Sequence, residues 1–320
     1  MSAYREEVSD MKIGKVRFEE NRGWFQDAAS HDEIHERFHY PAFIIKKFVQ
    51  EAISLPSNLC FDAPLVAVGW AVLIGVETRG DLPPLYIIGG LFLAVWGIYL
   101  FDRIFDSFRL PIIEATPRRH LFAKKYRFIL YFLSGVTVFA GATFILPHVT
   151  ADLFKVAFAP GLLCLLYFVI FRFARQSGGL RIPAKELVIG FCFASGVMVA
   201  AGTHYTEFSS WVLGLALAFL FAGNCLVIGS AEQEFDSEMD AASFFGNRGT
   251  RDWIPIFLLS GVLLLALILA LWYSVPFVGA SLIIGSLLQF ICFKRAGTDL
   301  MQPLADAGLL FPWLLLLFFG

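Results

Sequence analysis

Long apolar runs alternate with short polar stretches along most of this chain. Each run approaches the length of about 20 residues that an α-helix needs to cross the hydrocarbon core of a bilayer. Charged residues gather between the runs and at their ends. The pattern predicts nine transmembrane helices, at residues 60–77, 83–101, 127–147, 152–172, 186–204, 209–231, 253–274, 277–293 and 301–319.

The segment before the first run, residues 1–56, is polar and of mixed charge. It has no stretch typical of a cleavable signal peptide, so we expect it to stay in the cytoplasm. Its last part, YPAFIIKKFVQEAISLP, places two lysines and a glutamate opposite aromatic residues. This arrangement favours a helix in the membrane interface, with a solvated helix as the alternative. We therefore expect an N-terminal segment over 1–56 and a transmembrane domain over 57–320.

The composition agrees with a membrane protein. The chain is 58% hydrophobic and 16% charged, whereas about 25% of the residues of a soluble domain are charged. The net charge of -2 argues against a nucleic-acid partner. All five cysteines lie in or beside apolar runs without a CxxC pair, which favours packing roles over disulfides or zinc ligation. The expected fold class is an all-α, polytopic membrane protein, a bundle of transmembrane helices surrounded by membrane lipid.

Lysine and arginine are distributed unequally between the two sets of loops. The loops after the second, fourth, sixth and eighth runs are rich in them, whereas the opposite loops contain only Arg79 and Lys155. Positive loops stay in the cytoplasm. The N-terminus and the ends of the even-numbered runs are therefore expected in the cytoplasm and the C-terminus outside, in the inner or plasma membrane if the chain is bacterial.

Two acidic clusters follow the second and sixth runs. The first contains Asp102 and Asp106, and the second, in SAEQEFDSEMDAAS, contains Glu232, Asp236 and Asp240. Residues four apart share one face of a helix, where like charges repel by a few tenths of a kcal/mol per pair. Nearby groups are therefore expected to compensate this repulsion.

The two clusters are also related to each other. Asp236 lies 134 positions after Asp102, and Asp240 lies 134 positions after Asp106. Four runs separate them, so both clusters are expected at the cytoplasmic face, as in a chain of two parallel half-repeats. Carboxylates facing each other across a cavity suit Mg²⁺ with a phosphorylated substrate, and basic residues nearby would neutralise phosphate oxygens. Hydrophilic membrane ends without a ligand are the alternative.

A few polar residues lie inside the apolar runs. Asp62 and Asp306 lie just inside the first and last runs, and Asn224 lies within the sixth. Ionisable residues at such depth normally face the interior of a bundle or water. Each could equally be a structural residue with local hydrogen bonds. Gly190 and Gly223 are expected to allow close approach of helices.

With these features the chain resembles the UbiA superfamily of intramembrane prenyltransferases, over roughly residues 60 to 319. The first motif of that family, NDxxDxxxD, aligns with IYLFDRIFD. Asp102, Asp106 and the intervening Arg103 match, whereas Ile98 and Tyr99 replace the family's Asn and Asp.

The second family motif, DxxxDxxxD, resembles Glu232, Asp236 and Asp240, and RIPAKELVIG resembles the family's loop leading into the fifth span. The resemblance implies transfer of an isoprenyl group from a prenyl diphosphate to an aromatic or other lipophilic acceptor, with Mg²⁺ as cofactor. The residues implied to be catalytic are Asp102, Asp106, Asp236 and Asp240, with Glu232 as a further metal ligand. The residues expected to bind substrate are Arg103, Arg118, Arg119, Lys185, Asn224, Asp62 and Asp306.

Three alternatives remain at this stage. Without the Asn/Asp pair, the chain could be a family member with altered chemistry. It could be a secondary transporter with coupling sites at Asp62 and Asp306, although transporters usually carry their polar groups near the midplane. A CDP-alcohol phosphotransferase would need a DGxxAR run, which DRIFDS does not match. The sequence does not identify protein partners, which stay unknown.

Overall fold

The computed structural model describes residues 55–109, 112, 116–173, 184–203, 207–232, 235, 253–294 and 301–317. Within these residues the chain is helical and contains no strand. An α-helix satisfies its backbone hydrogen bonds internally, which an apolar segment requires where no water is present. The predicted all-α class is confirmed.

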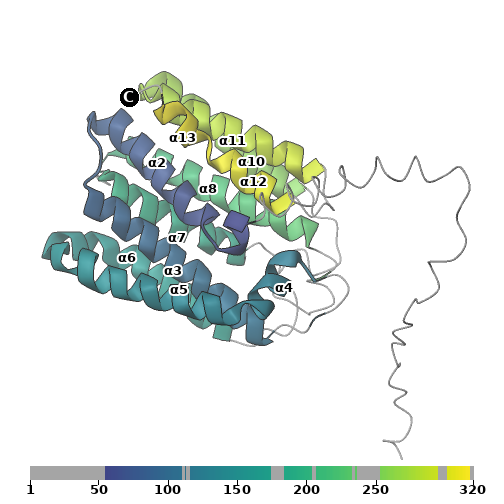
Figure 1. Ribbon diagram of the computed structural model, residues 1–320. Coiled ribbons are helices and arrows are strands. Elements are labelled where there is room, and N and C mark those ends of the chain that lie inside the picture. Colours follow the sequence, from purple (N-terminus) through teal and green to yellow (C-terminus); the bar gives the residue numbers. More distant parts are fainter. Residues whose placement is uncertain are drawn as a thin grey trace, which may run out of the picture. The chain divides into compact units, whose positions relative to one another are not determined.

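Eleven α-helices are found in the described part of the chain (Figure 1). They are α2 (Asp62–Arg79), α3 (Leu85–Arg109), α4 (Arg118–Lys125), α5 (Arg127–Ala140), α6 (Ala151–Tyr167), α7 (Ala184–Ala201), α8 (Phe208–Ala231), α10 (Trp253–Trp272), α11 (Pro276–Lys294), α12 (Met301–Leu309) and α13 (Phe311–Leu316). Short π-helical turns at Gly141–Ile145 and Phe168–Phe173 follow α5 and α6.

Six of the described helical segments are long and apolar enough to cross a membrane. They comprise α3, α5 with the turns that follow it, α6, α8, α10 and α11. The chain is therefore an all-α integral membrane protein. Nine spans, two half-repeats and the orientation of the termini stay predictions. The described part of the run predicted at 301–319 forms two shorter helices, because Pro312 lacks the N–H that a continuing helix would need and lies in the first turn of α13.

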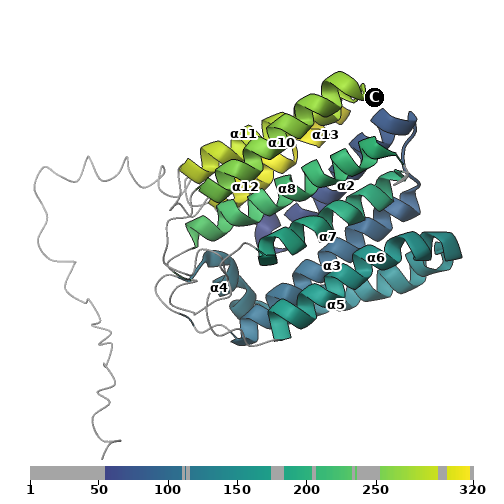
Figure 2. The same ribbon diagram turned by 180° about the vertical axis from the view of Figure 1, so that it is seen from behind.

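The helices form three neighbouring groups (Figures 1 and 2). Helices α2, α7 and α8 lie in the middle, with α10 to α13 on one side and α3, α5 and α6 on the other. Helix α7 packs against both α8 and α2, and α8 also packs against α10. Helix α6 packs mainly against α7, so it lies at the edge of the bundle.

The core is centred on the middle group. Trp70 of α2 and Leu217 of α8 are fully buried there. The indole N–H of Trp70 donates to the backbone oxygen of Leu309 at 3.1 Å. The indole N–H of Trp313 donates to the backbone oxygen of Leu65 at 2.8 Å. These two bonds attach α12 and α13 to α2, although the helices are far apart in sequence.

A carboxylate ties the end of α2 to the start of α11. The N–H of Phe277 donates to Oε1 of Glu77 at 2.7 Å, and the N–H of Val278 donates to Oε2 at 2.6 Å. Both N–H groups belong to the first turn of α11, where no intrahelical acceptor exists. A negative side chain is favourable at this positive end of the helix dipole.

Large apolar side chains are exposed along α5 and α6. They include Phe128, Phe132, Phe139 and Phe158. So many exposed aromatic rings on neighbouring helices would be unfavourable in water. We infer that this surface faces lipid.

Helices α7 and α8 pack closely against each other at Gly190. A Cβ added at Gly190 would lie 2.3 Å from the backbone oxygen of Ala218 and 2.9 Å from Cβ of Ala222. Gly190→Ala is therefore expected to lower the free energy of unfolding by about 2 kcal/mol. Thermal unfolding in detergent measures the change. Gly135→Ala on α5, where an added Cβ meets nothing within 4 Å, is the control and should not destabilise. Equal stability of both variants would contradict this packing.

Candidate functional site

A cavity of about 620 Å³ lies between α3, α6, α7 and α8. Its α3 residues recur every three or four positions from Tyr86 to Asp106, so they share one face of the helix. At 1.5 Å per residue this face extends about 30 Å, which is close to the thickness of about 30 Å of the hydrocarbon core of a bilayer. The cavity is therefore long as well as large.

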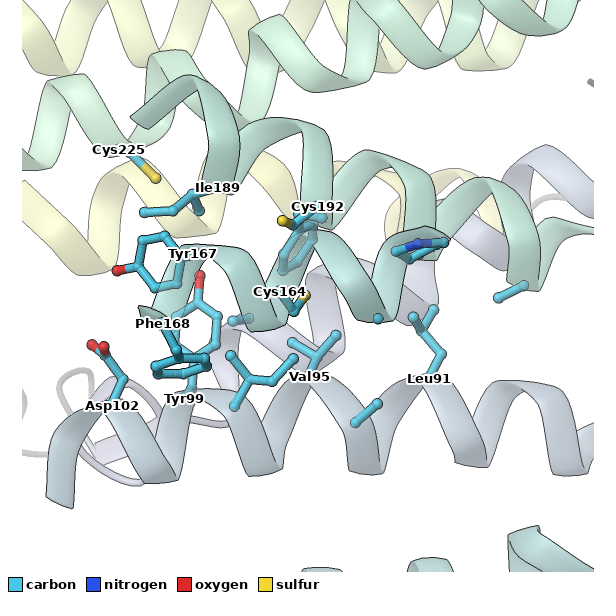
Figure 3. Close-up of a pocket in the computed structure, with 18 of the residues that line it drawn as sticks. Leu91, Val95, Tyr99, Asp102, Cys164, Tyr167, Phe168, Ile189, Cys192 and Cys225 are labelled. Carbon is cyan, nitrogen blue, oxygen red and sulfur yellow. The ribbon is translucent and has the colours of Figure 1, made fainter. Parts of the chain in front are cut away.

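Most of this length is apolar. Figure 3 shows Val95 of α3 near Cys164 of α6, and Leu91 of α3 and Cys192 of α7 line the same cavity. Small residues of α6, among them Gly161, also line the cavity. Their short side chains occupy little of the space between α6 and α3. An extended apolar ligand fits such a space better than a compact polar one.

Acidic residues of both predicted clusters meet at one end of the cavity. Asp102 and Asp106 line it from the last turns of α3, and Glu232 lines it from the position just after α8. The period of four places the two aspartates on one face, as the sequence indicated. Asp236 and Asp240 lie outside the described residues, and their roles stay predictions.

Three basic side chains lie among these carboxylates. Arg119 of α4 forms an ion pair with Glu232, and Nδ1 of His120 lies 3.6 Å from Oδ2 of Asp106. Arg103 is only 8% exposed and lies within electrostatic reach of Asp106 and Glu232. A buried charge needs partners of opposite sign. The basic groups thus provide the compensation that the acidic stripes require.

Helix α4 carries two of these groups into the cavity. The sequence suggested a basic loop here, but the chain forms a helix after Pro117, whose fixed φ suits a helix start. Arg119 and His120 line the cavity, whereas Arg118 is exposed and is not among the lining residues. The His120 ring stacks on Phe235, with centroids 5.4 Å apart.

A second polar group lies in the cavity wall. The side-chain amide of Asn224 donates from Nδ2 to Oδ1 of Asp306 at 2.7 Å, and both residues line the cavity. The carboxyl group of Asp62 lies within electrostatic reach of Asp306. Asp62 is 8% exposed and is not a lining residue. The three polar residues predicted inside the apolar runs therefore form one cluster.

The two positions that depart from the family motif also line the cavity. Ile98 and Tyr99 precede Asp102 by one turn of α3. Lys185, predicted to bind substrate, lines the cavity from the first turn of α7. Tyr99 therefore brings a phenol hydroxyl to the wall where the family motif has an aspartate (Figure 3).

The fit to a metal depends on the two aspartates. No group of three or more His, Cys, Asp or Glu side chains that could hold a metal ion occurs among the described residues. Asp102 and Asp106 offer two carboxylates one turn apart. Mg²⁺ commonly uses one or two carboxylates and completes its shell with water and substrate phosphates. These residues fit a cation that binds together with a phosphorylated ligand.

The chain matches no known family model. A comparison with curated proteins finds no match either.

Some residues of the cavity were missed by the sequence reasoning. His120 and Glu186 each follow a residue that was predicted, Arg119 and Lys185. The only sequence signal for His120 and Glu186 was that each lies next to a residue predicted to bind substrate. Tyr167 lines the cavity from the end of α6 (Figure 3). A tyrosine at the end of an apolar run resembles any membrane-interface tyrosine, so no signal distinguished it.

Proposed function

We propose that this protein is a Mg²⁺-dependent prenyltransferase, which transfers an isoprenyl group from a prenyl diphosphate to a lipophilic acceptor within the membrane. One observation carries the proposal. A single cavity is apolar over most of its length and has acidic and basic groups at one end. A prenyl diphosphate has the same division into a long apolar tail and a charged head.

The head of the substrate is assigned to the polar end. Arg119 and Lys185 line the cavity and would bind phosphate oxygens. Asp102 and Asp106 would hold Mg²⁺ together with those oxygens, and Glu232, Asp236 and Asp240 are the further predicted ligands. The cation would stabilise the negative charge of the departing diphosphate. Arg119 forms an ion pair with Glu232. When the diphosphate binds, a phosphate group would replace Glu232 as the partner of Arg119.

The tail of the substrate is assigned to the apolar part. Leu91 and Val95 of α3 and Gly161 of α6 line it. An apolar wall excludes water from the carbon that reacts, so the isoprenyl group would reach the acceptor instead of being hydrolysed. Burial of the tail would also supply binding energy, by the hydrophobic effect.

The resemblance to the UbiA superfamily supports the same function. The motif positions Asp102, Asp106 and Glu232 line one cavity, together with the departures Ile98 and Tyr99. A family member with altered chemistry stays an alternative to this proposal. Its difference would begin at Tyr99, where a neutral phenol replaces a metal-binding carboxylate.

A secondary transporter is the second candidate, and the cluster of Asp62, Asp306 and Asn224 favours it. Ionisable groups buried between membrane helices often mark the path of an ion or a proton. A transporter of an unrelated solute would not bind a prenyl diphosphate in a Mg²⁺-dependent manner. Binding therefore discriminates between the two candidates.

The test is binding of geranylgeranyl diphosphate to the purified protein in detergent, with Mg²⁺ and with a chelator. We expect saturable binding that the chelator abolishes. Arg119→Gln should weaken it about tenfold, because a charge-assisted hydrogen bond is lost. The neighbouring Arg118→Gln, at an exposed position, should change affinity by less than about twofold. Binding that ignores both Mg²⁺ and Arg119 would contradict the proposal.

A further inference from the structure

The apolar part of the cavity lies between two different ends. At the polar end Asp102 and Asp106 line it from the last turns of α3. At the far end Tyr86 and Phe154 line it from the first turns of α3 and α6. Between these ends the described lining residues of α3 and α6 carry no charge. The cavity therefore has a defined apolar length.

The far end has the features of a membrane boundary. Asp81 precedes α3 by four positions, and its side chain is 69% exposed. Asp152 and Lys155, an exposed ion pair with 2.9 Å between its charged atoms, belong to the first turn of α6. The ring of Tyr86 lies beside that of His148, with centroids 5.2 Å apart, and such amphipathic rings are typical of a membrane–water interface. A tail that extended past Tyr86 would therefore leave apolar surroundings.

Helices α3 and α6 run in the same direction along the cavity, from the far end to the polar end. The rings of Phe101 and Phe168 meet near the polar end, with centroids 5.8 Å apart. Gly90 and Ala157 each lie 11 positions before one of these rings. Because both helices rise about 1.5 Å per residue, these two lining residues lie at nearly the same depth.

The spacing of the lining residues on α3 converts this depth into a length. Asp102 and Tyr86 are 16 positions apart, which corresponds to about 24 Å along the helix. Figure 3 shows this face of α3 from Asp102 to Leu91. The diphosphate and its cation would occupy the first turn beside Asp102. From Ile98 to Tyr86, 12 positions then remain for the tail, or about 18 Å.

The length of an isoprenyl tail can be compared with this space. Each isoprene unit adds four bonds to the main chain of the tail. Three bonds of a fully extended peptide advance by about 3.5 Å, so four bonds advance by about 4.6 Å. Four units therefore extend about 18 Å, whereas six units extend about 28 Å and exceed even the distance between Asp102 and Tyr86.

We propose that the cavity selects a prenyl diphosphate with a tail of four isoprene units, and that the depth from Asp102 to Tyr86 sets this length. The inference rests on the proposed prenyl transfer and names the class of its donor substrate. A shorter tail leaves part of the wall without contacts and loses their dispersion attraction. A tail of six units places apolar carbons beyond Tyr86, where exposure to water is unfavourable.

The first experiment measures length preference with the purified wild-type protein in detergent and Mg²⁺. Prenyl diphosphates of two, three, four and six isoprene units compete with labelled geranylgeranyl diphosphate, which has four. We expect the four-unit compound to bind at least about tenfold more tightly than the two-unit and six-unit compounds. Equal affinity for all four lengths would overturn the inference.

The second experiment shortens the cavity with Ala157→Trp. A large side chain at this lining position would end the apolar space near the depth of Gly90, eight positions from Ile98. The remaining length of about 12 Å holds two units. Affinity for the four-unit compound should fall at least about tenfold, while affinity for the two-unit compound should stay within about twofold of wild type.

Two further variants test whether position decides this result. Gly196→Trp introduces the same side chain from α7 at a similar depth, because a Cβ added at Gly196 would lie 3.6 Å from Cδ1 of Leu91. It should shift the preference in the same direction. Val156→Trp is the matched control, since Val156 is 47% exposed and does not line the cavity. It should keep the wild-type preference.

The outcomes separate this inference from the proposed function. Equal losses for short and long tails in Ala157→Trp and Gly196→Trp, or an unchanged preference in both, would overturn the inference. Wild-type protein that binds none of the four diphosphates in a Mg²⁺-dependent manner would contradict the proposed function itself. The two failures are therefore distinguishable.

Discussion

Asp102→Asn is expected to lower prenyl transfer at least about a hundredfold, the effect seen when one metal-site or charge-stabilising group is removed. Asp102 lines the cavity from the last turns of α3, one turn before Asp106. The amide keeps the size of the side chain but removes the negative charge that would bind Mg²⁺. The rate is measured with purified protein, a prenyl diphosphate and membrane lipid extract, by product mass spectrometry.

The matched control for this variant is Asp152→Asn. Asp152 lies in the first turn of α6, is mostly exposed and pairs with Lys155 at 2.9 Å. It does not line the cavity, and exposed pairs contribute little to stability. Its variant should transfer at the wild-type rate. If Asp102→Asn also keeps that rate while folded, Asp102 is not part of the catalytic site.

Gly161→Trp is expected to block the apolar part of the cavity. An added Cβ at Gly161 meets no atom within 4 Å, so the larger side chain has room to extend into the space that this residue lines. Each methylene group of the ligand tail that can no longer be buried in the cavity lowers the binding free energy by about 0.8 kcal/mol. Affinity for geranylgeranyl diphosphate should therefore fall at least about tenfold, because two methylenes already account for this change.

A short substrate and a second glycine provide the controls. Dimethylallyl diphosphate has the same head and a short tail, so its affinity for Gly161→Trp should stay within about twofold of wild type. Gly135→Trp adds the same side chain to an exposed position of α5 outside the cavity wall. It should bind both diphosphates normally. Equal losses for the short and long substrates would contradict the assignment of the tail.

Much of the fold could be predicted from the apolar runs. Their length and composition indicate helices regardless of what packs against them, because a bilayer leaves few other conformations available. Even the short run at 277–293 forms a helix, α11. The division between α12 and α13 was missed, since an apolar run shows where lipid or core is favoured and not where a proline interrupts the backbone hydrogen bonds.

The acidic part of the site could also be predicted in part. A spacing of four places Asp102 and Asp106 on one face of any helix, and an even number of runs places Glu232 at the same membrane side. The structure brings these three residues to one cavity. Arg119 was predicted as well, together with Arg118. Only Arg119 lines the cavity, because of the rotation of α4 about its axis, and the sequence of a short basic helix does not determine that rotation.

Contacts between distant helices were beyond the sequence. Asp62 and Asp306 were each noted as polar residues inside apolar runs, but nothing local indicates that α2 and α12 are neighbours. His120 was missed for a related reason. A histidine in a basic stretch looks like a surface residue until packing places it beside Asp106 and Phe235.

The most direct test of the central claim is product analysis with purified protein in lipid, supplied with geranylgeranyl diphosphate and membrane lipid extract. The account predicts a lipophilic product heavier by one geranylgeranyl group less one hydrogen, with release of diphosphate, only when Mg²⁺ is present. It also predicts that Asp102→Asn forms none of this product above background. Wild-type protein that binds no prenyl diphosphate and forms no such product in the presence of Mg²⁺ would contradict the account.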